Sequence, residues 1–574
     1  MNWARTASSD SASPTAGPKL RHGRTEYGVK LLARGAAMPT SFLSSNVKFL
    51  VHLRHRMHDD NRLGLCLGAG VSTYFNIPGW PTLIARIAEH EAIKGTALLE
   101  VSESFTAQTQ FLYQRYLQSP QAAPLPGEDD VERERRVRIG WLDLVHECLY
   151  RDTKTSDEDL KGHPYLWALV PLIKASAMTI NYNFDDTVER MLYLFNNEQN
   201  GKRDDKGFEV IWSPSSQFRR NRGVLYHPNG FLPLEKIDGF SENIVFMEQE
   251  FADQLADIGA GHYSALLSHL AKHTIIFLGL SLSDANLKHL LRVSARQNPG
   301  TFHYHIHWCP TKPSIDEQEA IRKANFSTYN LVTLFLDSEE IKQLATILVM
   351  PDEEFSALCD AESDGLLTDY RYYLTGPVGG GKTSTLEHIK GLATFDEWVD
   401  RRNPLLGRPH GDLSTSERES VDEWINQQFR KKNRRVTSAR DQLSLVDRSP
   451  LDPLYFVADE GAVASRAAEL LRWMVPSKGR ITHIAPGHLI ILKCNERILK
   501  LRLANRGKTY NEEQLKIQSE AILNMWRGHP ATIIDTTNMT PSQVVSKVPE
   551  AVLFQEYAPI DFDLLCKKIA KAGN

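Results

Sequence analysis

The sequence has few cysteines and no closely spaced pair of them. Its six cysteines are scattered over 574 residues, and none belongs to a Cys-x-x-Cys pair. This spacing argues against a disulfide framework and against a four-cysteine zinc site. Long apolar runs are also missing, since a stretch such as TIIFLGL is far too short to span a bilayer. We therefore expect a cytoplasmic protein in a reducing compartment, with no membrane partner.

An excess of charge of one sign is also absent. The chain has 67 basic and 71 acidic residues and a net charge of −4. Nothing in this balance calls for a nucleic-acid backbone as partner. The apolar content of 41% and the length allow two to four domains with real cores.

Residues 1–44 differ from the rest in composition. They are rich in small and polar residues and contain six basic and two acidic side chains. A transit peptide has a similar composition, but this segment has no clear amphipathic repeat. We expect a disordered N-terminal arm, or a chain whose working start is Met38.

Apolar segments alternate with helical patterns over residues 45–345. Strands are predicted in LGLCLGAGVS, at the end of LWALVPLIKASAMTINYNFDD, in HTIIFLGLSLSD and in FHYHIHWCP, and a helix in WPTLIARIAEH. The charged insertion 126–138 is expected to be a solvated loop or an exposed helix. The pattern predicts a doubly wound parallel sheet, in which ligands bind beyond the carboxyl ends of the strands.

An acidic linker is expected at 346–365, because residues 351–365 hold six acids and no base. A second α/β series then occupies 366–574. Its predicted strands are RYYLTG, QLSLVD and HLIILKC; helices are predicted after Lys382, in SRAAELLRWMV and, long and charged, from about Asn495. The fold class is therefore α/β, with two doubly wound parallel-sheet domains.

The first glycine-rich turn follows the first predicted strand. Gly68, Ala69, Gly70 and Ser72 form a G-A-G-x-S pattern. Small residues allow the backbone to approach a pyrophosphate, and the N-terminus of a following helix favours its charge. A tight strand-to-helix turn needs the same residues, so this motif alone does not establish a binding site.

Three further segments follow this turn: NFDDTVE (183–189), YHPNGFLP (226–233) and GLSLSDANLKHLL (279–291). As a set, the four segments resemble the sirtuin-like NAD-binding domains of bacterial antiphage defence proteins, over about residues 45–340. The resemblance implies that the glycine turn holds the NAD pyrophosphate and that IPGW (77–80) is a mobile loop over the nicotinamide. Asn183, or alternatively Asn181, would face the nicotinamide ribose. The remaining implied NAD-site residues are Asp185, Gly279 and Ser281, with Asp284 and Asn286 on the adenosine side.

The same resemblance implies that His227 is the general base or the ribose-activating group. Members of the family commonly have a histidine directly before the glycine of this motif, where this chain has Asn229. Either His227 acts from a shifted position or the site is catalytically weak. Cleavage of the NAD glycosidic bond produces an oxocarbenium-like centre, and an amide and an imidazole suit the positioning and proton transfer that it needs. Sirtuin deacylases of the familiar kind carry a four-cysteine zinc module, and no cysteine pair in this chain could build one. This absence favours NAD hydrolysis over protein deacylation.

The second glycine-rich turn, GPVGGGKT (376–383), fits the phosphate-loop pattern without a mismatch. The pattern predicts that backbone N–H groups cradle phosphates, that Lys382 reaches the terminal phosphates and that Thr383 ligates Mg²⁺. The predicted nucleotide-binding residues of this loop are Gly376, Gly379, Gly380, Gly381, Lys382, Thr383 and Ser384.

The segment VDRSPLDPLYFV (446–457) resembles the D/E-R-S motif of deoxynucleoside and nucleoside monophosphate kinases. The resemblance implies Asp447 near Mg²⁺ and Arg448 on substrate or phosphoryl oxygens. RLANRGKTYNEEQL (502–515) is similar to their lid, so Arg502 and Arg506 would clamp the phosphoryl group. In those kinases an acid stands several positions before a tryptophan; here Asp396 and Glu397 are directly beside Trp398, so the register differs.

These features predict an antiphage NAD hydrolase that depletes cellular NAD when its kinase-like domain senses a nucleotide or a phage-derived trigger. The expected ligands are NAD as substrate, ATP or another nucleotide, and Mg²⁺, and a homo-oligomer is expected. One alternative is a nucleoside or nucleotide kinase with a regulatory NAD-binding domain. Another is a non-catalytic defence scaffold.

Overall fold

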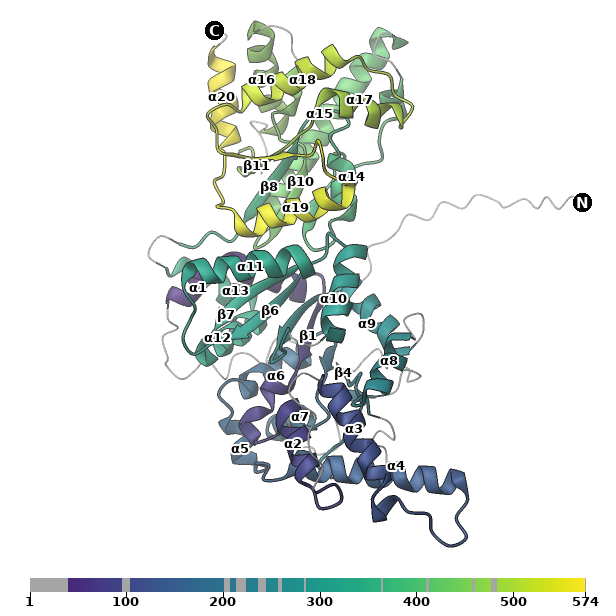
Figure 1. The fold of residues 1–574 in the computed structure, drawn as a ribbon. Helices are drawn as coiled ribbons and strands as arrows, with labels where there is room; N and C mark the ends of the chain where they lie inside the picture. Colours follow the sequence, from purple (N-terminus) through teal and green to yellow (C-terminus); the bar gives the residue numbers. More distant parts are fainter. Residues whose placement is uncertain are drawn as a thin grey trace, which may run out of the picture.

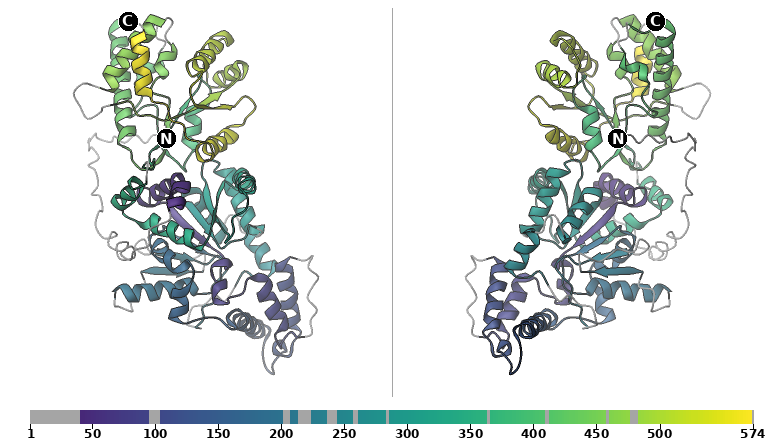
Figure 2. Two further views of the ribbon diagram at one scale, coloured as in Figure 1. Left: turned by 90° about the vertical axis from the view of Figure 1, so that its left-hand side faces the viewer. Right: turned by 90° about the vertical axis from the view of Figure 1, so that its right-hand side faces the viewer.

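The computed structural model describes residues 40–94, 104–200, 207–212, 223–235, 244–256, 261–282, 285–362, 365–408, 412–456, 460–475 and 483–572. It contains two parallel sheets in separate parts of the chain, stacked one above the other (Figures 1 and 2). The predicted fold class is confirmed. The arm predicted at 1–44 lies outside the described residues up to residue 39, and helix α1 begins at Thr40.

The first sheet has seven parallel strands in the order β3-β4-β2-β1-β5-β6-β7. The strands are β1 Leu63–Leu67, β2 Thr179–Asn181, β3 Phe208–Ile211, β4 Gly223–Tyr226, β5 Thr274–Leu278, β6 His303–Trp308 and β7 Leu331–Leu336. Strands β1, β2, β5 and β7 are buried along their whole length, as expected for a parallel sheet covered on both faces. The chain first extends the sheet on the β2 side of β1 and later on the β5 side. The β1–β5 crevice is therefore a topological switch point, where such sheets bind ligands.

The helices of this part are α1 Thr40–His58, α2 Trp80–Glu89, α3 Phe105–Leu117, α4 Asp130–Tyr150, α5 Asp157–Gly162, α6 Leu166–Ala175, α7 Thr187–Asn200, α8 Glu248–Ala256, α9 Gly261–Lys272, α10 Ala285–Gln297, α11 Ile315–Tyr329, α12 Ser338–Val349 and α13 Asp352–Asp360. Residues 130–138 of the charged insertion form the first part of α4, which begins with a capping box between Asp129 and Glu132. Within the segment 346–365, α13 buries Phe355 under the Arg54 guanidinium, which also pairs with Asp352 at 2.6 Å. This acidic stretch is therefore packed against α1.

The second sheet has five parallel strands in the order β12-β11-β8-β10-β9. They are β8 Tyr370–Thr375, β9 Ala393–Phe395, β10 Leu443–Asp447, β11 His488–Lys493 and β12 Ala531–Asp535. The helices are α14 Lys382–His388, α15 Thr415–Ser438, α16 Glu460–Met474, α17 Glu496–Ala504, α18 Glu512–Met525, α19 Pro541–Phe554 and α20 Phe562–Ala572. The prediction of one long helix from Asn495 is wrong, because the chain turns at Gly507, whose φ is +69°, and a new capping box begins α18 at Asn511.

The two parts meet through helices α1, α11 and α19, with α11 facing α19 at the junction (Figure 1). Phe326 of α11 contacts Phe554 of α19 with ring centroids 5.1 Å apart. Lys48 of α1 donates to the carbonyl oxygens of Val552 and Gln555, at 3.0 and 3.1 Å. Among the described residues, no helix combines the length and apolar character that a bilayer crossing requires.

Candidate functional sites

The loop after β1 and the loop after β5 are pressed together at the switch point. Gly70 N donates to Gly279 O at 2.9 Å, and Gly68 N donates to Leu278 O at 3.0 Å. A Cβ on Gly70 would lie 2.9 Å from Gly279 Cα, so a larger residue would force the loops apart. The glycines of both predicted motifs thus allow the two loops to approach each other. Their predicted contact with a pyrophosphate stays a prediction.

The first glycine turn does not open directly into an α-helix. Ala69–Val71 and Thr73–Phe75 form two successive 3₁₀ turns, and α2 begins only at Trp80. The helix predicted in WPTLIARIAEH is present as α2, and its support of an anion at this turn stays a prediction. At the turn itself the backbone is closely packed against the loop after β5.

The Asn183 side chain lies beside this turn with a defined orientation. Its Nδ2 donates to Gly68 O and to Ser72 Oγ, both at 3.1 Å. Because a backbone carbonyl can only accept, the amide nitrogen must face Gly68, and Oδ1 points the other way. Ser72 Oγ in turn donates a hydrogen bond to Asp185 Oδ1 at 3.2 Å. The structure thus brings together four of the predicted NAD-site residues, and Asn183 Oδ1 remains an acceptor at the site.

The Asp185 carboxylate is held inside the protein. Besides Ser72 Oγ, its Oδ1 accepts the Thr187 N–H at 3.1 Å, and the residue is buried. Burial raises the pKa of this carboxyl group, although the hydrogen bonds from Thr187 and Ser72 oppose the shift. Asp185 therefore fixes Ser72 and, through it, the Asn183 amide.

His227 follows β4 and is completely enclosed, with 0% of its surface exposed. Its Nδ1 donates to Asn183 O at 2.9 Å, and its Nε2 pairs with Glu189 Oε1 at 2.7 Å. Burial alone would lower the pKa of the imidazole, but the Glu189 carboxylate outweighs it and the pKa is raised. Both ring nitrogens are occupied in this conformation. Sequence reasoning missed Glu189 as a site residue, although the NFDDTVE motif ends on it.

The alternative residues Asn181 and Asn229 also lie at this edge of the sheet. Asn181 ends β2, and its Oδ1 accepts the Asn183 N–H at 3.2 Å. Its buried Nδ2 has no acceptor in the described part of the chain. Asn229 is buried, and its carbonyl accepts from Val245 N at 2.7 Å. Because a buried amide with an unmet donor can serve a ligand, Asn181 stays an alternative to Asn183.

The remaining predicted NAD-site residues follow β5. Ser281 is exposed in the loop. Asn286 lies in the first turn of α10, and Asp284 lies outside the described residues.

In the second domain, the phosphate loop joins β8 to α14. Lys382 folds back onto its own loop, where Nζ donates to Gly376 O at 2.7 Å and to Pro377 O at 3.0 Å. Burial lowers the pKa of Lys382 to about 8. The Val378 N–H is occupied by Gln518 Oε1 from α18, at 3.1 Å. A bound phosphate would compete with these contacts.

A hydroxyl and a carboxylate meet at the end of the phosphate loop. Thr383 Oγ1 donates to Asp447 Oδ2 at 3.3 Å, and Asp447 Oδ1 is buried with no partner in the described residues. Lys432, which sequence reasoning missed, donates to Asp447 O at 2.8 Å. Burial raises the pKa of the Asp447 carboxyl group. This donor set fits the oxygen ligands that Mg²⁺ prefers.

Arg448 brings a further acid into this site. Its φ is +66°, a left-handed backbone conformation at the residue directly after β10. Its Nε lies 2.7 Å from Glu397 Oε1, and Nη1 lies 4.0 Å from Asp452 Oδ2. Asp452 in turn accepts Thr375 Oγ1 at 3.0 Å. In the sequence, Glu397 is closer to Trp398 than the corresponding acid of the kinases is to its tryptophan. The fold nevertheless brings Glu397 to the D-R-S motif.

The two lid-like arginines reach different places. Arg506 donates to Ser384 Oγ of α14 at 2.9 Å, so the fold brings it to the phosphate loop. Arg502 donates to Thr536 O at 2.9 Å, just after β12. In this conformation Arg502 anchors α17 to the end of β12.

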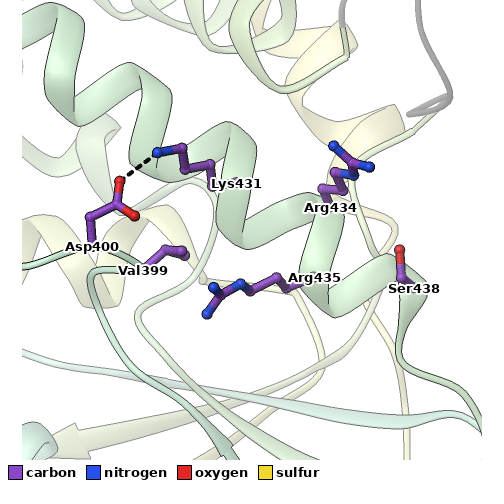
Figure 3. A pocket seen from close by; sticks show the side chains of 6 residues that line it. All are labelled: Val399, Asp400, Lys431, Arg434, Arg435 and Ser438. Carbon is purple, nitrogen blue, oxygen red and sulfur yellow. Dashed lines mark hydrogen bonds and ion pairs between the residues drawn. The ribbon is translucent and has the colours of Figure 1, made fainter. Parts of the chain in front are cut away.

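A hollow of about 350 Å³ lies on the outer face of α15, lined by Val399, Asp400, Lys431, Arg434, Arg435 and Ser438. Lys431 is already paired with Asp400 at 2.5 Å. Figure 3 shows Arg434 and Arg435 pointing in different directions. These cations do not converge on one point, and none of the lining residues belongs to either site.

Comparisons with known proteins find similarity for parts of the chain. Residues 177–333 match the SIR2-like domain family, a range that runs from the residues before β2 into β7 and contains Asn183 and His227. No curated protein matches the chain. Two solved structures of deoxyadenosine kinase from M. mycoides, one with dCMP and dCDP and one with dATP, are 13% and 14% identical. Each match covers 32% of this chain and 98% of the kinase, with a TM-score of 0.25.

Proposed function

We propose that the chain is an NAD hydrolase of antiphage defence that depletes NAD under the control of a nucleotide bound to its second domain. The observation that carries the first half is the oriented Asn183 amide, which lies inside the SIR2-like match. Its Oδ1, which accepts no hydrogen bond from the described residues, would accept one from a nicotinamide-ribose hydroxyl or from the attacking water. Holding these groups in line lowers the barrier to cleavage of the glycosidic bond, and the released nicotinamide is neutral.

A contact between the two domains supports the proposed control. The phosphate-loop helix α14 ends at His388, and the Lys390 and Gly391 N–H groups after it donate to Gly300 O, at 3.2 and 2.9 Å. Gly300 belongs to the loop after α10, whose first turn holds Asn286 of the predicted NAD site. A nucleotide that moves α14 would therefore act on the element that is predicted to line the adenosine side.

His52 of α1 reinforces this contact. Its Nε2 donates to Gly391 O at 2.6 Å, and its Nδ1 accepts from the Tyr304 hydroxyl at 2.9 Å. Burial lowers the pKa of His52 to about 3, so the ring is neutral and one nitrogen donates while the other accepts. Through His52, the segment after α14 is thus joined to β6 and α1 of the first domain.

The antiphage role rests on the family resemblance alone.

A second activity, phosphoryl transfer to a nucleoside or nucleotide, is favoured by the Glu397–Arg448 pair beside Thr383 and Asp447. Glu397 would accept the proton of the acceptor hydroxyl, and Arg448 would hold Glu397 or the phosphoryl oxygens. Mg²⁺, held by Thr383 and Asp447, would neutralise charge on the phosphates.

Incubation of the full chain with NAD plus each of a panel of nucleotides, and separately with ATP and a panel of nucleosides, tests both activities. Release of nicotinamide supports the hydrolase, and formation of a nucleoside phosphate supports the kinase. Turnover of neither would refute both and favour a scaffold.

A further inference from the structure

We propose that Glu189 and His227 form a positioning pair, which holds Asn183 in place through its backbone and takes no proton from the substrate. This inference rests on the proposed NAD hydrolase function, since it assigns how the same site is kept in order. It departs from the expectation that His227 is the general base.

The hydrogen-bonding pattern of the ring carries the inference. Asn183 O can only accept, so His227 Nδ1 must carry a hydrogen. The other nitrogen, Nε2, shares a proton with Glu189 Oε1 across 2.7 Å. Neither nitrogen is left with a lone pair directed at a ligand. The side chains of both residues are at most 3% exposed, so substrate has no direct path to the ring.

The contact connects three elements of the sheet edge. Glu189 lies in the first turn of α7, His227 follows β4, and Asn183 follows β2. Phe231 covers the ring, with centroids 4.7 Å apart. The other charged group that acts on His227 is the Asp185 carboxylate, which belongs to the network around Ser72. The loop 182–186 is therefore fixed from both sides, by His227 on its backbone and by Asp185 on its side-chain network.

Substitution of His227 separates positioning from base catalysis. Asn places an amide N–H near the position of Nδ1 but cannot act as a base at neutral pH. If His227 positions Asn183, His227→Asn should keep NAD turnover within about tenfold of the wild type, while His227→Ala loses far more. A general base contributes about 10²–10⁴-fold, so equal losses of that size in both variants would overturn the proposal.

Glu189→Gln provides an independent readout. Removing the carboxylate lowers the pKa of His227, because Glu189 is what raises it. If His227 were the base, the acid limb of the kcat/KM profile would move to lower pH in this variant. A positioning role predicts an unmoved limb. Glu250→Gln is the matched control, since Glu250 is another partly buried carboxylate, paired with Arg138 in α4.

One measurement does not depend on turnover. In protein labelled with ¹⁵N-histidine, and with His227→Asn to assign the signal, Nδ1 of His227 should stay protonated from about pH 6 to 8. Loss of that proton within this range would overturn the proposal even if turnover were normal. Failure of the hydrolase function itself would appear differently, as no nicotinamide release by the wild type with any nucleotide.

Discussion

Replacement of Gly300 by alanine should uncouple the two domains without altering either site. Gly300 lies where the loop after α10 touches the end of α14. A Cβ at this position would lie 2.1 Å from His388 O and 2.7 Å from Ile389 Cα, both backbone atoms that cannot rotate away. The two loops must therefore separate in Gly300→Ala.

The magnitude follows from the contacts that separation would break. Gly300 O accepts two backbone hydrogen bonds, and His52 Nε2 makes a third to Gly391 O. Each contributes about 0.5–1.5 kcal/mol net, so the bridge is worth about 1.5–4.5 kcal/mol. Allosteric coupling energies are typically about 1–3 kcal/mol, so losing this contact suffices to abolish the nucleotide response.

The assay is NAD turnover titrated with ATP, alongside calorimetry of each ligand. Gly300→Ala should bind NAD and ATP within about threefold of the wild type, yet its turnover should change by less than about twofold when ATP is added. Gly223→Ala is the control, because the nearest atom to its Cβ would be 3.7 Å away. A full nucleotide response in Gly300→Ala would refute the bridge as the route of coupling.

Three further outcomes are expected. Asn183→Ala should stay folded, by its circular dichroism spectrum, and lose at least about 10²-fold in NAD turnover, because the ribose or water loses its acceptor; wild-type rates would exclude the role. Lys382→Ala should weaken ATP binding by about tenfold or more in calorimetry, because the variant loses the positive charge that contacts the ATP phosphates. NAD binding should stay unchanged, and equal ATP affinity in the variant would contradict the assignment. Burial lowers the pKa of Lys382 to about 8, and the negative charge of bound phosphates would raise it again. ATP binding at about pH 8.5 should therefore take up a proton, which is measured as a dependence of the binding enthalpy on the buffer. If no proton is taken up, Lys382 does not contact the phosphates.

The lowered pKa of Lys382 also determines how the free energy of unfolding changes with pH. Between about pH 8 and 10.5 the unfolded chain keeps a proton on Lys382 that the folded chain has lost. The unfolded state then binds more protons, so this group makes the free energy of unfolding rise with pH across that window. Lys382→Met should reduce that rise in denaturant titrations.

The sheet strands could be predicted where they are buried apolar runs that end in turns. Strands β1, β5, β8, β10 and β11 have this pattern, and each was predicted. Strands β3, β4, β7, β9 and β12 were missed. Of these, β9 has only three residues and β12 is largely uncovered, with Ile533 56% exposed. Strand β7, LVTLFL, is fully buried and has the apolar pattern, so it is an exception that the sequence reading overlooked. A short or half-exposed strand lacks the continuous apolar signal that sequence reading uses.

The sites were predictable as motifs but not as contacts. The phosphate-loop pattern located Lys382 and Thr383 because the backbone path alone requires those glycines. The Glu189–His227 pair joins residues 38 positions apart, and the Glu397–Arg448 pair depends on how β9 lies beside β10. Such pairs are set by the order of strands in a sheet, which no local spacing reports.

The most direct test of the hydrolase proposal is nicotinamide release from NAD by the full-length protein, with and without ATP, beside the Asn183→Ala variant. We expect the wild type to release nicotinamide at a rate that depends on ATP, and Asn183→Ala to release none above background. Intact NAD under every condition, or equal rates in the two proteins, would contradict the proposal.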